Sequence, residues 1–415
     1  GRPLGAWLET PPSAGLPEVV REEPWPMEGR CPGRSFYPPV LGPREPTVAW
    51  SLPGVALRPL QSAVVDSSER IFLLGRAEDP DASGVLSAVD SSGALLWSLD
   101  LGSPVVGSPA IGGGGEILLS LPYSILALKT DGSYSSEAPY GAPPPFPANY
   151  LASDSPVLSF TGGVLVSTFR TLATMDSDLE LSWERELDRR NITGPVVDAS
   201  GRASLLMDYG WDLGYPALSL QRFDRLGLFE ELAILQGDRM GSLALDASGA
   251  FYIVTLPIVR PNDMKVRAYG MSPVGELRII FEDEYSDLSI PAQALGPGGP
   301  VLCLTWNDPS WQGRVVQVGQ NGARLFDTLL EGARTHGPMI VDGEGWIYVG
   351  GRVLDEHAAV FALDPSGALR WSILLPGSWR DPNARAFLLA MGGQGRIYAA
   401  ADGDLFAIGE ASVAP

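Results

Sequence analysis

The sequence predicts an all-β protein built from eight repeats of four short antiparallel strands. A turn position, three residues before the turn glycine, recurs eight times along the chain at steps of 39 to 50 residues. A second turn follows the first within each of seven repeats, and it recurs at steps of 39 to 48 residues. The composition, with 49 Gly and 37 Pro, suits a chain with many turns. Repeats of this length are typical of propeller blades, so we predict an eight-bladed β-propeller, with seven blades as the alternative.

The repeat is clearest in residues 337–377. Its predicted strands are Met339–Val341, Trp346–Val349, Ala359–Leu363 and a last strand that carries Trp371. Aromatic and β-branched residues fill these strands, and Asp-Gly or Ser-Gly turns separate them. The first turn of the eight repeats opens at Asp66, Gly112, Ser159, Asp198, Asp246, Leu295, Asp342 and Gly392. The second turn opens at Asp90, Lys129, Asp176, Asp224, Ser272, Gly319 and Asp364.

The last repeat is incomplete. It contains Ile397–Ala400 and Asp404–Ile408, and the chain then ends before a fourth strand. A matching strand stands at the front of the chain, Thr47–Pro53, and carries Trp50. We expect this strand to complete the eighth blade, because closing the ring removes exposed sheet edges. The predicted domains are therefore a proline-rich arm, 1–46, and a propeller, 47–415.

Two segments, ALDPSGALRW (362–371) and AVDSSGALLW (88–97), resemble the pyrroloquinoline-quinone-type (PQQ) repeat of the quinoprotein-dehydrogenase-like propellers. The resemblance implies an eight-bladed fold in which a Trp packs between blades. That family includes quinone-dependent alcohol dehydrogenases and the non-catalytic BamB-type lipoprotein of outer-membrane assembly, which this chain resembles more in size and in its lack of catalytic motifs. By the same spacing, blades 4, 5 and 6 carry Glu231, Ile279 and Phe326 in place of the Trp. The resemblance implies a structural role, and a largely buried position, for Trp50, Trp97, Trp183 and Trp371.

The resemblance does not extend to the cofactor site. The family's dehydrogenases use two adjacent cysteines, whereas Cys31 and Cys303 are the two cysteines of this chain and lie far apart. No segment matches the family's calcium ligands. We therefore expect no cofactor and no enzymatic activity. A disulfide between Cys31 and Cys303 is an open alternative if the chain is extracytoplasmic.

The chain has two histidines, His336 and His357. With Asp355 they could meet around a metal ion, since both lie in connections expected on one face of blade 7. Solvated surface histidines are the favoured interpretation, so no metal is expected.

The charge and hydropathy of the chain disfavour some classes of binding partner. The net charge is −20, which disfavours nucleic acid and anionic membranes. No apolar run approaches the 18 residues needed to span a bilayer. The arm, with Trp7 and Trp25, must rest on its own propeller or on a partner, because its composition alone would leave it extended. We favour the propeller for residues 30–46 and leave 1–29 open.

The second-to-third strand connections are longer and more varied than the other turns, and they should share one face, where binding tends to occur. Aromatic residues gather there on blades 4 and 6. We therefore predict a non-catalytic scaffold that binds proteins as a subunit of an extracytoplasmic assembly, in the periplasm, cell envelope or exterior. The alternative is an enzyme or carbohydrate-binding propeller that uses the funnel on that face. The candidate partner-binding residues are Trp7, Trp25, Tyr209, Trp211, Tyr215 and Trp311.

Overall fold

The protein is described here from a computed structural model. The structure describes residues 24–25, 27–31, 34, 36, 38–55, 63–76, 83–102, 105, 107–121, 124–140, 155–159, 163–168, 171–188, 190–191, 193–210, 217–236, 238–257, 265–284, 292–306, 312–353, 357–376, 387–401 and 403–411.

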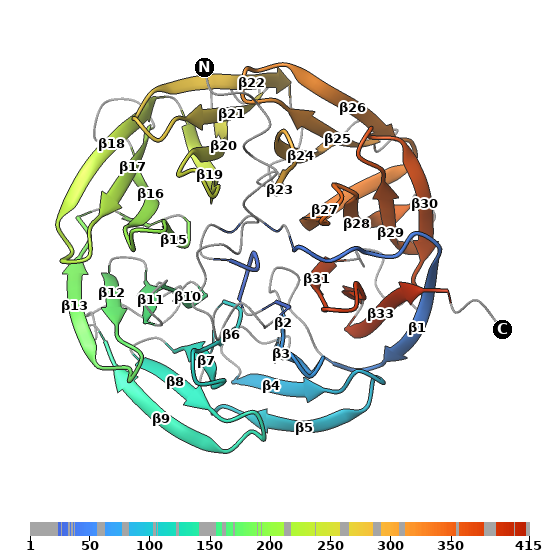
Figure 1. Ribbon diagram of the computed structural model, residues 1–415, viewed down its shortest axis with the longest axis horizontal. Helices are drawn as coiled ribbons and strands as arrows, with labels where there is room; N and C mark the ends of the chain where they lie inside the picture. The colour runs from blue at the N-terminus through green and yellow to red at the C-terminus, as the bar shows by residue number, and fades with distance from the viewer. Residues whose placement is uncertain are drawn as a thin grey trace.

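Within these residues the chain forms eight antiparallel sheets arranged as a ring, which confirms the eight-bladed propeller. Successive sheets follow one another around the circle in chain order, with each first strand nearest the centre and each last strand at the rim (Figure 1). Blade 1 contains β2 (Val64–Val65), β3 (Ile71–Arg76), β4 (Gly84–Val89) and β5 (Leu95–Asp100). Blade 2 contains β6 (Ala110–Ile111), β7 (Ile117–Ser120), β8 (Ser124–Leu128) and β9 (Tyr134–Pro139). Blade 3 contains β10 (Val157–Leu158), β11 (Val164–Ser167), β12 (Thr171–Met175) and β13 (Leu181–Glu186).

Blade 4 differs in that two short segments pair with its second strand. It contains β14 (Arg190–Asn191), β15 (Val196–Val197), β16 (Ala203–Gly210), β17 (Ala217–Phe223) and β18 (Phe229–Gln236). Blade 5 contains β19 (Asp238–Leu245), β20 (Phe251–Pro257), β21 (Lys265–Met271) and β22 (Leu277–Glu284). Blade 6 contains β23 (Ala292–Gly296), β24 (Gly299–Trp306), β25 (Gln312–Val318) and β26 (Arg324–Leu330). Blade 7 contains β27 (Ala333–Val341), β28 (Ile347–Val353), β29 (His357–Leu363) and β30 (Leu369–Leu374).

Blade 8 closes the ring as the sequence predicts. It contains β31 (Phe387–Met391), β32 (Ile397–Ala401), β33 (Asp404–Glu410) and, as its outer strand, β1 (Pro46–Leu52). β1 pairs antiparallel with β33, from Pro46 opposite Glu410 to Leu52 opposite Leu405. The two ends of the chain therefore share one sheet.

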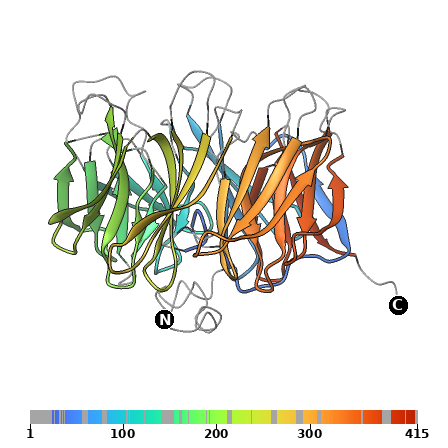
Figure 2. The ribbon, with the colours of Figure 1, turned by 90° about the horizontal axis from the view of Figure 1, so that it is seen from above.

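The repeated turns are held by one local arrangement. In the turn that opens at Asp90, the carboxylate Oδ1 accepts hydrogen bonds from the backbone N–H groups of Ser92 and Ala94, both at 2.9 Å. Gly93 then takes a φ of 89°, which glycine adopts without strain. Such turns connect the first two and the last two strands of a blade. They lie on one face of the ring, which we call the turn face (Figure 2).

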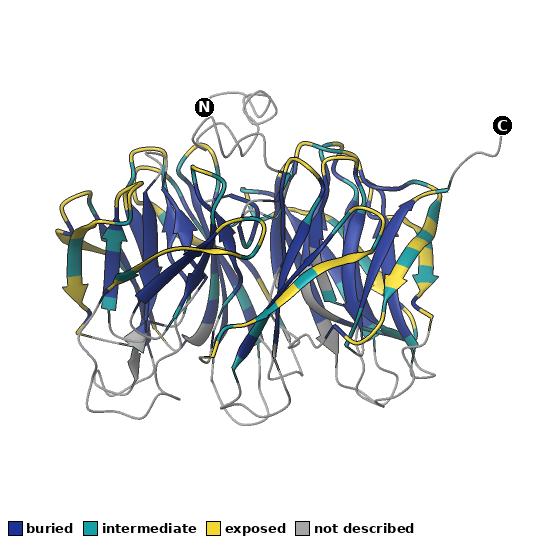
Figure 3. Ribbon diagram, turned by 90° about the horizontal axis from the view of Figure 1, so that it is seen from below, coloured by how far each residue is buried: buried dark blue, intermediate teal, exposed yellow. Residues whose placement is uncertain are grey.

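Burial follows the position of each strand in the blade (Figure 3). The inner strands are buried on both sides, as in Ile117–Ser120, where all four residues are buried. Outer strands alternate between half-buried and exposed residues, as in Leu369–Leu374. The core is therefore made by the inner three strands of neighbouring blades packing against one another.

Aromatic residues of the outer strands connect one blade to the next. The Trp97 ring of blade 1 lies on the turn of blade 2, where its Nε1 donates to the Thr130 carbonyl at 3.1 Å. A Cβ on Gly132 would come within 3.1 Å of that ring, so the turn glycine also leaves room for it. Trp50 of blade 8 bonds the Ser91 carbonyl of blade 1 in the same way, at 3.0 Å.

These Trp residues are less buried than the sequence led us to expect. Trp50, Trp97, Trp183 and Trp371 are all half-buried. One side of the ring packs on an aromatic residue of its own blade, as Trp371 does on Tyr348, with 5.9 Å between ring centroids. These residues lie on the outermost strand of each blade, where residues alternate between half-buried and exposed, and this position leaves the rings half-buried.

The residue that takes the Trp position in blades 4 and 5 also differs from our expectation. In blade 1, Trp97 pairs with Ala88, because a β-bulge follows directly after the turn. In blades 4 and 5 the bulge lies deeper in the hairpin. The residues in register with Trp97 are therefore Glu230 and Arg278, instead of Glu231 and Ile279. The assignment of Phe326 in blade 6 is confirmed.

The described part of the arm enters the central channel at the turn face, seen in blue within the ring in Figure 1. Trp25 bridges to Val65 of the innermost strand of blade 1, with backbone hydrogen bonds of 3.2 and 2.9 Å. Two blades away around the ring, the Phe36 carbonyl accepts from the Val341 N–H of blade 7 at 3.0 Å. Met27 packs into the cluster of blades 2 to 4 and is fully buried. The described part of the arm thus contacts blades on several sides of the channel at this end.

Deleting residues 1–55 should unfold or aggregate the protein, since it removes β1 and the buried Trp25 and Met27 and exposes the β33 edge. A thermal melt followed by circular dichroism, together with size-exclusion chromatography, measures this. Deleting residues 1–23 is the control and should leave the melt unchanged. A cooperative, unshifted melt of the larger deletion would contradict the closure.

Replacing Trp97 by Ala should lower the free energy of unfolding by about 2–3 kcal/mol, at the low end for an aromatic truncation because the ring is half-buried. Urea denaturation measures it. The matched control is Ser136→Ala, at the same register position of blade 2, which should change stability by less than about 0.5 kcal/mol. Equal effects of the two substitutions would show that the aromatic ring does not hold the blades together.

Candidate binding surfaces

Most residues predicted to contact a partner lie outside the described residues. These are Trp7, Trp211, Tyr215 and Trp311, together with the side chain of Tyr209. Trp25 is described, and the prediction for it is wrong: its side chain is fully buried in the core cluster of blades 1, 7 and 8. It packs beside Phe36, with 6.3 Å between ring centroids. Trp25 therefore anchors the arm to its own propeller.

The candidate metal site cannot be assembled from the described residues. His357 is half-buried at the start of β29, whereas Asp355 and the side chain of His336 lie outside the described part of the chain. Among described residues, no three His, Cys, Asp or Glu side chains gather in a way that could hold a metal ion. No helix formed by them is long and apolar enough to cross a membrane.

The alternative of a disulfide between Cys31 and Cys303 is wrong. Cys31 lies in the core cluster of blades 2 to 4, and Cys303 lies in the cluster of blades 6 and 7, so their sulfur atoms are not bonded. Burial raises the pKa of the Cys303 thiol to about 12, which makes it unreactive at neutral pH.

The described part of the opposite face carries a buried acidic group on blade 5. Asp238 begins β19 and is fully buried. Burial raises its pKa, against the hydrogen bond that the Tyr269 hydroxyl donates to it at 2.6 Å and the attraction of Arg267. The carboxylate is thus already satisfied by two side chains of its own blade.

On the turn face, the arm places an arginine between blades 7 and 8. The Arg44 Nη1 donates to Asp342 Oδ2 at 2.7 Å and to the Tyr348 hydroxyl at 2.5 Å. Its guanidinium also lies over the Trp346 ring, 4.1 Å from the centroid. The Asp342 side chain is completely buried beneath it. We call this group the arginine site.

The residues before Arg44 complete the arginine site. The Gly42 N–H donates to Asp342 Oδ2 at 3.0 Å, and the Pro43 carbonyl accepts from Trp371 Nε1 at 3.1 Å. Pro43 thereby supplies the carbonyl that a turn residue of the next blade supplies elsewhere in the ring. Burial alone would lower the pKa of Arg44, but the hydrogen bond to Asp342 raises it. The guanidinium is therefore held charged in this position.

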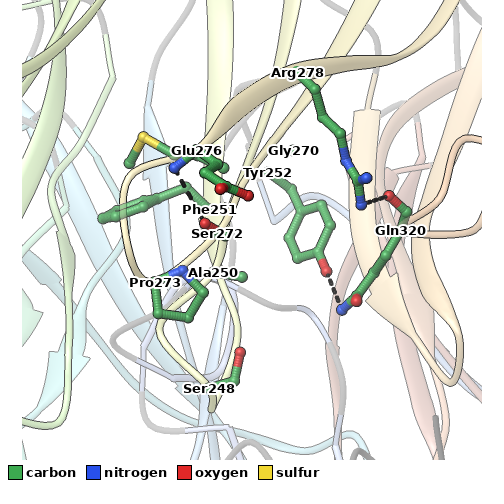
Figure 4. A pocket seen from close by; sticks show the side chains of 11 residues that line it. Ser248, Ala250, Phe251, Tyr252, Gly270, Ser272, Pro273, Glu276, Arg278 and Gln320 are labelled. Atoms are coloured by element: carbon green, nitrogen blue, oxygen red, sulfur yellow. Dashed lines mark hydrogen bonds between the residues drawn. The ribbon is translucent and has the colours of Figure 1, made fainter. Parts of the chain in front are cut away.

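Blade 5 carries the same acid and tyrosine, but its nearby arginine, Arg278, donates to the Gln320 carbonyl instead of to the acid. Asp246 opens its first turn and Tyr252 follows six residues later, as Tyr348 follows Asp342. A cavity of about 160 Å³ lies beside Tyr252, between blades 5 and 6 (Figure 4). Glu276, Arg278 and Gln320 contribute to its lining. We call this cavity the blade 5–6 notch.

A second notch occupies the matching place between blades 2 and 3, with a cavity of about 200 Å³. Gly112 stands there at the position of Asp246, and Leu118 at that of Tyr252. Ser136 of this lining holds the register position of the inter-blade Trp. Both notches thus lie at junctions without an aromatic residue at that position. Carboxylates line both notches, Glu116 and Asp178 in the blade 2–3 notch and Glu276 in the blade 5–6 notch, and the blade 5–6 notch also offers the phenol of Tyr252.

Exposed apolar residues gather in the third-to-fourth strand turns of blades 4 and 5. Leu226 is 70% exposed and Val274 is 84% exposed. The corresponding residue, two after the turn-opening position, is Ser, Asp or Asn in the other repeats that contain this turn. Leu228 and Phe229 extend the apolar surface of blade 4 and are 61% and 66% exposed. We call these four residues the blade 4–5 patch.

Known proteins resemble this chain in shape only. No protein family matches it, and no curated protein matches it in sequence. The structure described as the Dos1 propeller has a TM-score of 0.58 at 12% identity, over 89% of this chain and 97% of that one. Sqt1 of Chaetomium thermophilum has a TM-score of 0.53 at 14% identity, over 87% and 98%. A quinonprotein alcohol dehydrogenase-like protein of Bacteroides thetaiotaomicron has a TM-score of 0.43 at 11% identity, over 79% and 96%.

At these identities the first two likenesses support the propeller fold, and the third is too distant to argue from. The BamB-type resemblance therefore stays an interpretation of the sequence.

Replacing Arg44 by Gln should lower the free energy of unfolding by about 1.5–3 kcal/mol, because it removes a charged donor from a fully buried carboxylate. Urea denaturation of Arg44→Gln, Asp342→Asn and the double variant measures the coupling between them. The control is Lys265→Gln, which breaks an exposed pair with Glu282 and should cost less than about 1 kcal/mol. A coupling near zero would mean that Arg44 and Asp342 do not stabilise each other.

Proposed function

We propose that the protein is a non-catalytic propeller scaffold that binds other proteins as a subunit of a larger extracytoplasmic assembly. The blade 4–5 patch carries this proposal. Large exposed apolar residues grouped on one face are typical of surfaces that contact proteins.

The fold does not require apolar residues at these positions. The turn in blade 1 carries Ser92 there, whose hydroxyl donates to the Asp90 carboxylate at 2.7 Å. Leu226 and Val274 forgo that bond and expose a branched apolar side chain to solvent. The Leu226 N–H still donates to Asp224, and in both turns the glycine N–H donates to the turn-opening carbonyl, so the apolar residue changes the surface and leaves the turn unaltered.

The arm supports a scaffold in a second way. Its described part lies inside the ring at the turn face, where Trp25 and Met27 are fully buried in the clusters of blades 1, 7 and 8 and of blades 2 to 4. At this end of the propeller, a partner would contact the exposed turns around the ring. The expectation that the long connections of blades 4 and 6 also contribute belongs to residues outside the described part.

The test is a purification of the tagged full chain from cells that make it, with partner stoichiometry and affinity then measured on the isolated complex. Leu226→Ser and Val274→Ser should each weaken binding by more than about 1 kcal/mol, or roughly fivefold, with an unchanged melt. Leu96→Ser is the matched control, because Leu96 is 48% exposed on the outer strand of blade 1.

Trp211→Ala and Trp311→Ala test the opposite face in the same assay. A chain that purifies alone and turns over a substrate would contradict the scaffold. Binding that all four substitutions leave unchanged would contradict both proposed surfaces.

A further inference from the structure

We propose that the blade 5–6 notch binds the guanidinium of an arginine carried by an extended segment of a partner protein. The inference rests on the proposed function, because it names the chemistry of the partner. It comes from a comparison of two blades of the same chain. At the arginine site of blade 7, Arg44 binds the acid that opens the first turn and the tyrosine that follows it, and blade 5 has the same two residues beside the notch.

The two sites match residue by residue. Asp246 and Asp342 open the same turn: each N–H donates to the carbonyl four residues later, at 3.0 and 2.8 Å. In both, Oδ1 accepts the turn's backbone N–H groups and leaves Oδ2 directed elsewhere. Tyr252 and Tyr348 then occupy the second position of the following strand.

The hydrogen bonding of the two carboxylates differs. Asp342 Oδ2 accepts from Arg44, from the Gly42 N–H and from the Tyr348 hydroxyl. Asp246 Oδ2 is buried and accepts no hydrogen bond of normal geometry from a described residue. Burial raises the pKa of Asp246, and burial together with that carboxylate raises the pKa of Tyr252. The Tyr252 hydroxyl, which accepts from Gln320, is the neighbouring group that interacts with the Asp246 carboxylate. A bound guanidinium would add the charged donor that Arg44 gives to Asp342.

The notch also has the space that the arginine site lacks. Ala250 stands where Trp346 stands, and Ser248 stands where Glu344 stands. These smaller side chains line the cavity of about 160 Å³, which holds several water-sized groups. Gln320, from the turn between β25 and β26, lines the notch on the blade 6 side, and its Nε2 donates to the Tyr252 hydroxyl at 2.9 Å (Figure 4). An entering guanidinium would replace this amide, as Arg44 contacts Tyr348.

Charge at the rim of the notch fits a cationic ligand. Glu276 lines it, and Arg278 is engaged with the Gln320 carbonyl. The whole chain carries a net charge of −20, which favours the approach of basic segments. Val274 of the blade 4–5 patch lies in the same turn as Ser272 and Pro273 of the lining, so one partner segment could contact both. A guanidinium is favoured over an ammonium because it presents several donors in one plane.

The experiment measures binding of a fluorescent peptide, Pro-Val-Leu-Gly-Pro-Arg-Glu-Pro, which is the sequence of residues 39–46, to the full chain by anisotropy. The peptide should bind the unaltered protein, and changing its Arg to Gln should weaken binding at least tenfold. Asp246→Asn should weaken it at least tenfold as well, because Asn keeps the Oδ1 acceptor of the turn and removes the charge.

Two further variants test whether the peptide binds in the notch or elsewhere on the protein. Gln320→Arg should block the peptide by placing a guanidinium of the chain itself beside Tyr252, and it should not destabilise the fold. Asp198→Asn is the control: Asp198 opens the same turn in blade 4, but its Oδ2 already pairs with Arg202 at 2.7 Å. It should leave peptide binding unchanged.

Absence of binding at millimolar peptide, or equal binding to Asp246→Asn and the unaltered protein, would overturn the notch proposal. Equal binding would show instead that the peptide displaces the arm at the arginine site. Neither result bears on the scaffold, whose partner can be captured through the blade 4–5 patch alone. Loss of the captured partner in Leu226→Ser with normal peptide binding would support both proposals separately.

Discussion

The structure depends on the pairing of β1 with β33. Seven blades are each made from one continuous stretch, but the eighth is assembled from both ends of the chain. A ring closed in this way has no free sheet edge at the junction, and its stability is shared among all the blades. It also fixes where residue 46 must lie. The preceding residues then have to run from the channel to the rim across blades 7 and 8.

This constraint explains the course of the described part of the proline-rich arm. Along its course the arm bonds the backbone of blade 1 through Trp25 and that of blade 7 through Phe36 and Val40. Near the rim, the Arg44 and Glu45 N–H groups donate to the Glu410 carboxylate at 2.7 and 2.9 Å. Arg44 then fills the junction that lacks a turn because blade 8 is built from two chain ends. The arm thus leads into β1, the strand that closes the ring. Its Arg44 also occupies the junction between blades 7 and 8, where blade 8 has no third-to-fourth strand turn.

The sequence was sufficient to predict the features that arise locally. The turns follow from Asp and Gly at fixed spacing, because a side-chain acceptor and a positive φ are properties of four or five residues. Closure followed from an incomplete last repeat. The bulge that moves Arg278 into the Trp position could not be predicted, because it depends on how two strands pack. Nor could the burial of Trp25, since an aromatic residue in a proline-rich segment does not indicate which surface it covers.

The candidate sites were hidden from the sequence for a related reason. The arginine site joins residues about 300 positions apart, and no local pattern connects Arg44 with Asp342. The notches arise where the repeat has no Trp at the rim and, in blade 5, where the small residue Ala250 replaces a large one. Such a replacement can be recognised only after the repeats have been aligned in three dimensions. The aromatic residues of the long connections were visible in the sequence, but Trp211 and Trp311 lie outside the described residues.

Repeats make it possible to separate what the fold needs from what it does not. A first turn forms without an acidic residue, since Gly112 and Gly392 open turns with the same backbone hydrogen bonds. Ser159 does so with a neutral side chain. The fold therefore does not need the carboxylate of Asp246, and burying a carboxylate lowers stability unless charged donors compensate for it. The same reasoning applies to Val274, whose exposed side chain the turn does not use. The scaffold can do without both residues, and both lie on turns at the same end of blade 5, one before β20 and one after β21. The proposed partner segment would therefore contact them together.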